Sequence, residues 1–158
     1  MSRQQLFERK NKIIGWREWV ELPGLNLQRI KVKIDTGART SALHAMHIKA
    51  FEQDGQMFVR FLVHPNQKQR LPEIECIALV LDQRQVKNSS GVSEKRYVIR
   101  TPILLGDKSW EVDITLTNRS PMGFRMLLGR TAIRNKYIVD PGHSFILTSK
   151  DQNYSNKK

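Results

Sequence analysis

Alternation of apolar and polar residues runs through the middle of the chain and predicts β-strands. In "RIKVKID", Ile30, Val32 and Ile34 fall on one face of an extended segment, which places Asp35 at the end of a half-buried strand. The segment "MFVRFLVHP" alternates in the same way, with Met57, Val59, Phe61 and Val63 on one side, and the His-Pro pair stops it.

Later segments repeat this pattern and are separated by turn residues. "EIECIALVL", "YVIRTPILL" and "SWEVDITL" each read as a strand, and Gly106-Asp107 predicts a hairpin between the last two. The polar stretch "QVKNSSGVSEKR" predicts a loop. Only "TSALHAMHI" and "TAIRNKY" have the composition of short helices. The chain is therefore predicted to be a small all-β barrel or sandwich with one or two short helices.

Length and hydropathy indicate one domain. A chain of 158 residues with 39% hydrophobic content is long enough for a single core and too short for two. We expect the domain to span 13–148, with flexible polar segments at 1–12 and 149–158. No apolar run approaches the ~20 residues of a membrane-spanning helix, and the start of the chain has no apolar stretch of signal-peptide length, so we expect a cytoplasmic protein without membrane contact.

The net charge of +12 is the strongest signal in the composition. Such an excess attracts nucleic acid, acidic protein surfaces or anionic lipid, and does not choose among them. A solvated basic surface without a dedicated partner accounts for it equally well. The single cysteine, Cys76, has no partner for an internal disulfide and reads as a small strand residue.

Two short motifs carry the candidate chemistry. Asp35-Thr36-Gly37 alone indicates only a turn, because Asp and Gly are favoured turn residues. Some ninety residues later, "FRMLLGRTAIRNKY" contains an apolar pair that ends in glycine and arginine; the residues are Leu127, Leu128, Gly129 and Arg130. Glycine at the end of a buried strand lets another backbone approach closely, as a loop that carries an active acid requires.

Together, "KIDTGARTSALHA" and the stretch from "VIRTPILL" to "FRMLLGRTAIRNKY" resemble the retropepsin-like aspartic peptidases. The similarity is closer to a bacterial family formerly labelled ATP-dependent zinc proteases and now regarded as retropepsin-like. The resemblance implies a closed acid-protease barrel with Asp35 as the catalytic acid. It also implies that Thr36, Gly37 and Ala38 support the site, with the Thr36 hydroxyl bonding across a dimer.

The chemistry of aspartic proteolysis requires a second acid. Two carboxylates about 3 Å apart share one proton; one acts as base on a water and the other polarises the scissile carbonyl. This chain has one Asp-Thr-Gly, and neither Asp113 nor Asp140 is followed by Thr/Ser-Gly. Asp140-Pro141-Gly142 reads as a turn. The second acid must come from another copy of Asp35, which predicts a symmetric homodimer.

Substrate-binding residues are less well marked. Arg39 stands where the retroviral enzymes carry an acid, which points to acidic substrates, although an exposed loop cation is an equal alternative. Val86 to Arg96, with Ser89, Ser90 and Gly91 at its tip, is the best candidate for a flap, with an ordinary surface loop as the alternative. Some relatives are encoded beside ligases that add glutamates to a ribosomal protein, so the resemblance suggests an acidic, glutamylated or ribosome-associated substrate or partner.

Other readings have less support. His44 and His47 could share a helical face, but no third ligand stands nearby, and neither an H-E-x-x-H nor a Walker A sequence is present, so we expect no metal and no nucleotide cofactor. The rival class is a non-catalytic basic β-barrel that binds nucleic acid, a ribosomal partner or an acidic protein. For that function, Trp16 and Trp19 would be either an exposed stacking platform or a packed strand edge.

Overall fold

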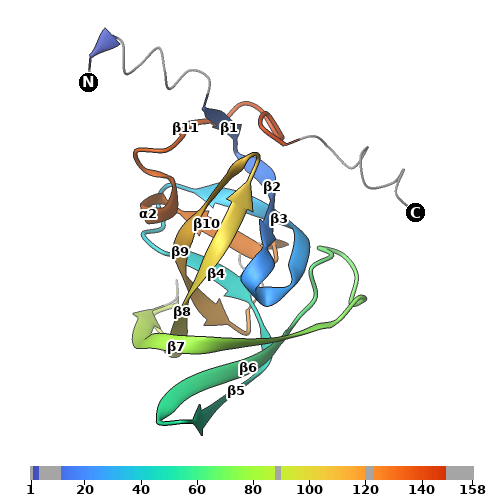
Figure 1. The fold of residues 1–158 in the computed structure, drawn as a ribbon. Coiled ribbons are helices and arrows are strands. Elements are labelled where there is room, and N and C mark those ends of the chain that lie inside the picture. The colour runs from blue at the N-terminus through green and yellow to red at the C-terminus, as the bar shows by residue number, and fades with distance from the viewer. Residues whose placement is uncertain (1, 4–11, 88–89, 120–122, 149–158) are drawn as a thin grey trace.

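The computed structural model describes residues 2–3, 12–87, 90–119 and 123–148, and the described chain is almost entirely β (Figure 1). A 3-10 helix, η1 (Pro23–Leu25), and a short helix, α2 (Arg130–Ile133), interrupt the strands. The strands are β1 (Ile13–Gly15), β2 (Arg17–Leu22), β3 (Leu27–Asp35), β4 (Ser41–His44), β5 (Met46–Gln53), β6 (Gln56–Val63), β7 (Ile74–Lys87), β8 (Ser93–Leu105), β9 (Lys108–Thr117), β10 (Met126–Gly129) and β11 (Ile138–Asp140).

Six strands close into a barrel. They follow the order β2-β3-β10-β4-β9-β8, and β2 returns to β8 where Glu21 pairs with Leu104. Strands β7, β6 and β5 continue the sheet beyond β8, as the green strands across the lower part of Figure 1 show. The prediction of an all-β closed barrel with one or two short helices is confirmed.

The alternating segments bury the predicted faces. Ile30 and Val32 of β3 are fully buried and Ile34 nearly so, and Val59, Phe61 and Val63 of β6 are fully buried. Met57 is the exception on its strand, because it lies near the β5–β6 turn, beyond the core, and is 37% exposed. The hairpin turn at Gly106-Asp107 is present, and Gly106 has the positive φ of 64° that favours glycine.

The predicted helix in "TSALHAMHI" is wrong: this segment forms β4 and the start of β5. Ser41, Ala42 and Leu43 are all buried, because β4 lies between β10 and β9 with both faces covered. A strand buried on both faces loses the two-residue alternation that identifies strands in a sequence. The predicted helix in "TAIRNKY" is confirmed only in its first three residues, which belong to α2, and a turn follows over 134–136.

The predicted loop "QVKNSSGVSEKR" is largely wrong as well. Its flanks are the paired ends of β7 and β8, with Arg84 opposite Arg96 and Lys87 opposite Ser93. Exposed and half-buried side chains alternate there and none is buried, so this part of the hairpin has no apolar face to mark it as strand. Between the two strands, residues 90–92 are described and belong to neither strand, and 88–89 lie outside the described residues.

The predicted flexible segments 1–12 and 149–158 lie outside the described residues, apart from residues 2, 3 and 12. The helices in the described ranges are all too short or too polar to cross a lipid bilayer.

A buried carboxylate ties the two ends of the domain together. Glu18 of β2 is fully buried, and its Oε2 accepts hydrogen bonds from the backbone N–H groups of Gly15 (2.7 Å), Ile146 (2.9 Å) and Leu147 (3.2 Å). Its Oε1 accepts from the backbone and hydroxyl of Thr148, at 2.9 and 2.6 Å. A buried charge is tolerated only when it is paired or well hydrogen-bonded, and here donors from both ends of the domain supply that compensation.

We expect Glu18→Gln to lower the free energy of unfolding by about 2–4 kcal/mol, because an amide would turn two further donors toward a site that already holds only donors. Urea denaturation at a fixed protein concentration measures the effect. Glu21→Gln on the same strand is the matched control and should change stability by no more than about 0.5 kcal/mol. Equal losses in the two variants would show that the network around Glu18 is not a main source of stability.

Candidate active site

The carboxylate of Asp35 is oriented by the turn that follows it. Asp35 ends β3, and its Oδ1 accepts hydrogen bonds from the backbone N–H groups of Gly37 (3.0 Å) and Ala38 (3.2 Å). The Ala38 N–H also reaches the Asp35 carbonyl at 3.2 Å. Asp35 is half-buried, whereas Thr36 and Gly37 are exposed. The tip of the turn therefore faces outward with its acid held in a defined direction.

The second motif lies directly beside this turn. Strand β10 pairs parallel to β3, so that Leu127 is opposite Lys33 and Gly129 is opposite Asp35. Leu127 and Leu128 are buried, and they anchor β10 in the core. A Cβ atom at Gly129 would lie 2.7 Å from the carbonyl carbon of Thr40, so only glycine lets the Arg39–Thr40 backbone pass at this distance.

The start of α2 holds the Asp35 turn in place. The Arg130 backbone N–H donates to the Ala38 carbonyl at 2.8 Å, and its Nη1 donates to the carbonyls of Thr36 and Gly37, both at 3.3 Å. The backbone N–H and the hydroxyl of Thr131 both donate to the Arg39 carbonyl, at 3.2 and 2.8 Å. The two motifs predicted to work together are thus joined by backbone and side-chain hydrogen bonds.

Buried hydroxyls complete the support and were missed from the sequence. Ser41 is fully buried, and its Oγ accepts a hydrogen bond from the Gly129 N–H at 3.0 Å. The Thr115 hydroxyl of β9 donates to the Ser41 carbonyl at 3.2 Å. No sequence signal marked these residues, because serine and threonine in a strand ordinarily read as solvent-facing positions. Thr131, an exposed residue of α2, was also missed, because its contact is with the distant carbonyl of Arg39.

The β7–β8 hairpin reaches the segment that follows the turn. The Arg84 guanidinium donates to the hydroxyl of Thr40 at 3.4 Å, and it is also paired with Asp82 at 3.3 Å. Of the predicted flap residues, Ser90 and Gly91 lie at the tip of this hairpin, while Ser89 lies outside the described residues. Arg84 was not predicted, because it lies between the predicted strand "EIECIALVL" and the predicted loop and belongs to no motif.

The other aspartates considered as a second acid are engaged elsewhere. Asp113 forms an ion pair with Arg100, at 2.7 Å between Oδ1 and Nε. Asp140 accepts from the backbone N–H of Gly142 at 2.9 Å and contacts His143 Nδ1 at 2.8 Å. The Gly142 N–H, followed by His143, lowers the pKa of Asp140. The turn predicted there is confirmed.

The two histidines considered as metal ligands do not share a helix. His44 ends β4, where Arg125 Nη1 donates to its Nδ1 at 3.0 Å, and His47 belongs to β5 with a φ of 53°. Burial, followed by the Arg125 charge, lowers the pKa of His44. Within the described ranges, His, Cys, Asp and Glu side chains form no group of three that could hold a metal ion.

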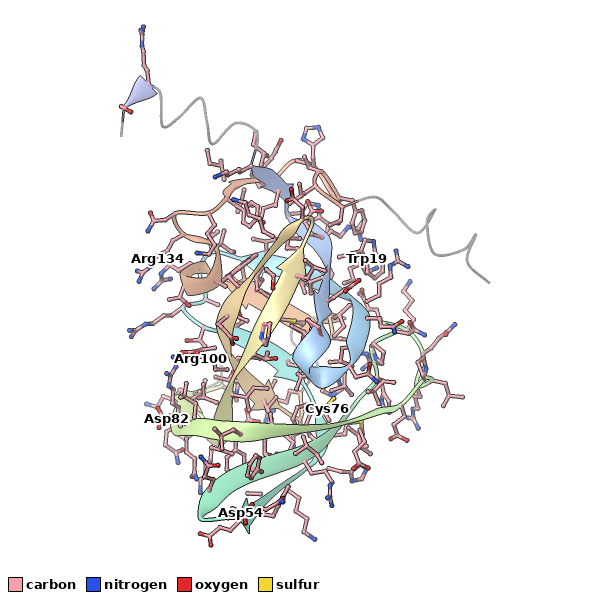
Figure 2. All side chains as sticks on the ribbon, viewed as in Figure 1. Trp19, Asp54, Cys76, Asp82, Arg100 and Arg134 are labelled. Atoms are coloured by element: carbon pink, nitrogen blue, oxygen red, sulfur yellow. The ribbon has the colours of Figure 1, made fainter. Side chains whose placement is uncertain are left out.

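The tryptophans considered as a stacking platform are packed against neighbouring side chains. Trp19, labelled in Figure 2, has the Arg29 guanidinium 3.7 Å from its ring centroid and stacks on Phe145 at 5.8 Å with 15° between the planes. Trp16 has Arg17 at 4.7 Å over its ring. Both indoles are half-buried, so they fit the packed strand edge better than the open platform.

A closed six-stranded barrel in which an Asp-Thr-Gly turn is braced by a parallel Leu-Leu-Gly-Arg strand defines a retropepsin-like fold. The comparison with family models agrees, since the family described as "Retropepsin-like aspartic endopeptidase RimB" matches residues 13–150. The chain belongs to this RimB-like family.

Curated relatives carry a different name. A protein of Shewanella pealeana called "Probable alpha-L-glutamate ligase" is 50% identical over 138 residues, which is 87% of this chain and 30% of that protein. A protein of the same name from Desulfotalea psychrophila is 49% identical over 82% of this chain and 28% of its own length. The chain thus spans less than a third of the curated relatives it matches, and their name describes a longer polypeptide.

A solved structure shares the fold. A crystal structure of a Legionella pneumophila protein of unknown function has a TM-score of 0.72 and 31% identity, covering 87% of this chain and 99% of that one.

Proposed function

We propose that the protein is an aspartic endopeptidase that works as a homodimer, with one Asp-Thr-Gly turn from each subunit. The observation that carries the proposal is the fixed direction of the Asp35 carboxylate in a turn whose Thr36 and Gly37 are exposed. A two-fold axis at this turn would place the Asp35 residues of both subunits side by side, and the second subunit would so supply the second acid.

In this mechanism, the two Asp35 carboxylates share one proton and bind a water between them. The ionised carboxylate takes a proton from the water as its oxygen attacks the peptide carbonyl carbon. The protonated carboxylic acid donates its proton to the carbonyl oxygen. When the tetrahedral intermediate collapses, the C–N bond breaks, the leaving nitrogen takes the proton that the first carboxylate received from the water, and the second carboxylate recovers a proton from a hydroxyl of the intermediate. The Gly37 and Ala38 N–H groups keep Oδ1 oriented throughout.

The β7–β8 hairpin is the candidate flap. Its tip carries Ser90 and Gly91, and its arm contacts the residue after the turn through Arg84 and Thr40. A hairpin tethered there would cover a bound peptide and exclude water from the reacting bond.

The proposed substrate is an acidic or glutamylated protein, including ribosome-associated ones. Three observations support this class: the net charge of +12, the exposed Arg39 beside the turn, and relatives in which a similar segment is part of a chain named as a glutamate ligase. A peptide that ends in a chain of glutamates is therefore the first substrate to test.

We expect the protein to sediment at twice the mass of one chain at micromolar concentration, because a single turn cannot form the dyad alone. Sedimentation velocity over a dilution series measures this, and cleavage of a glutamate-rich peptide should fall as the dimer dissociates. A monomer that cleaves the peptide with undiminished specific activity would rule out the shared site. A stable dimer without cleavage would instead favour the binding-protein alternative.

A further inference from the structure

Three lysines outside the candidate active site converge where separate parts of the chain meet. Lys12 precedes β1, Lys108 begins β9, and Lys136 lies between α2 and β11; we call them the three-lysine cluster. Their backbones are fixed by hydrogen bonds from Ile138 N–H to the Lys12 carbonyl (3.2 Å) and from Lys136 N–H to the Ile133 carbonyl (3.0 Å), and by the pairing of Lys108 with β8. The cluster therefore sits on a rigid frame.

Two aromatic rings form a base beneath these amines. Trp110 and Tyr137 are 5.8 Å apart between ring centroids. The Lys136 amine lies 5.7 Å from the Trp110 centroid, and the Lys108 amine lies 5.7 Å from the Tyr137 centroid. All three lysines are half-buried, and Lys108 and Lys136 lie against this aromatic surface, where the stems of long basic side chains pack while the amines stay in contact with water.

The positive charge of the cluster is not balanced within the described chain. The neighbouring Lys12 amine is the main cause that lowers the pKa of Lys108, and the Lys136 charge acts in the same direction. Asp107 acts in the opposite direction, but none of the ion pairs among the described residues includes a lysine of the cluster. Neighbouring like charges are unfavourable until an anion lies between them.

We propose that the three-lysine cluster binds a dianionic phosphate group. A phosphate presents several strong acceptor oxygens and close to two negative charges, which suits amines that arrive from three directions better than a single carboxylate does. The phosphate is either the free ion or the terminal phosphate of a nucleotide chain. This site is separate from the Asp35 turn and does not depend on the catalytic proposal.

Thermal unfolding of the full chain in inorganic phosphate, against chloride at the same ionic strength, tests the site. At a phosphate concentration about tenfold above its Kd, the midpoint should rise by roughly 3–5 °C. The double variant Lys12→Met/Lys108→Met keeps the apolar stems but removes two amines, so it should lose this rise. In chloride it should unfold no earlier than the wild type, because the repulsion is gone. Lys68→Met, at an exposed position, is the control and should keep the full rise.

A second readout locates the binding. Phosphate should shift the indole N–H resonance of Trp110 in the wild type and not in the double variant. RNA oligonucleotides with and without a 5′-phosphate then distinguish the source of the phosphate. If the protein prefers the phosphorylated oligonucleotide and the double variant loses this preference, the ligand is a nucleotide chain. If both oligonucleotides bind equally, the ligand is the free ion. An equal rise in the midpoint for the wild type and the double variant, or no rise beyond that in chloride, would overturn the proposal.

Discussion

Replacing Asp35 by Asn should abolish peptide cleavage while leaving the dimer intact. The amide keeps the size of the side chain, and its Oδ1 can still accept from Gly37 and Ala38, so the turn should persist. It cannot act as the base, and general acid–base groups of this kind contribute about 10²–10⁴-fold to the rate. The dimer should be at least as stable as the wild type, because two like charges no longer meet at the two-fold axis.

Asp54→Asn is the matched control. Asp54 lies at the exposed tip of the β5–β6 hairpin, where Figure 2 labels it, and has a φ of 53° that Asn also adopts readily. This variant should cleave at the wild-type rate. Cleavage by Asp35→Asn at a near wild-type rate would end the aspartic-peptidase proposal, because a residue that only forms a turn is replaced by Asn with little loss.

Mixed dimers separate a shared site from two independent ones. If wild-type and Asp35→Asn subunits are unfolded and refolded together in equal amounts, random pairing leaves about a quarter of the dimers with two intact acids. Activity should therefore fall to about a quarter of that of the same total amount of wild type. A fall to only about half would mean that each Asp35 acts alone.

The barrel could be predicted because most of its strands bury one face. Ile30, Val32 and Ile34 alternate with polar residues, so their spacing in the sequence shows that they lie on one face of the strand, and this face is buried. The same signal failed at β4, where both faces are covered, and at the outer part of the β7–β8 hairpin, where neither face is deeply buried. Periodicity reports a difference between two faces, and these segments have none.

The candidate site was predicted only in part. Asp35 and Gly129 were recognised because the turn and the close approach of two backbones each require a particular residue type. Ser41 and Arg84 were not, because their importance depends on what lies opposite them: a backbone N–H of β10 in one case and the Thr40 hydroxyl in the other. Such long-range partners leave no mark in a local pattern of hydrophobic and polar positions.

Gly129→Ala is the variant that should best reveal how the site depends on this packing. The added Cβ would lie 2.7 Å and 2.9 Å from the carbonyl carbon and oxygen of Thr40 and 3.0 Å from the carbonyl oxygen of Arg39. These are backbone atoms, so the clash cannot be relieved by a rotamer change, and the segment after the Asp35 turn must move. Overpacking of this kind costs about 1–3 kcal/mol of stability.

A displacement of about 1 Å in a catalytic loop can cost on the order of 10²-fold in rate, so we expect the loss of cleavage by Gly129→Ala to exceed what its loss of stability explains. Urea denaturation and kcat/KM at one protein concentration measure the two effects separately. Gly142→Ala is the control, because its Cβ would meet its nearest neighbour, Asp140 Oδ1, at an ordinary 3.4 Å. If Gly129→Ala were as stable and as active as this control, the close contact between β10 and the segment after the turn would not be what positions Asp35. The hydrogen bonds from Arg130 and Thr131 would then have to hold the turn on their own.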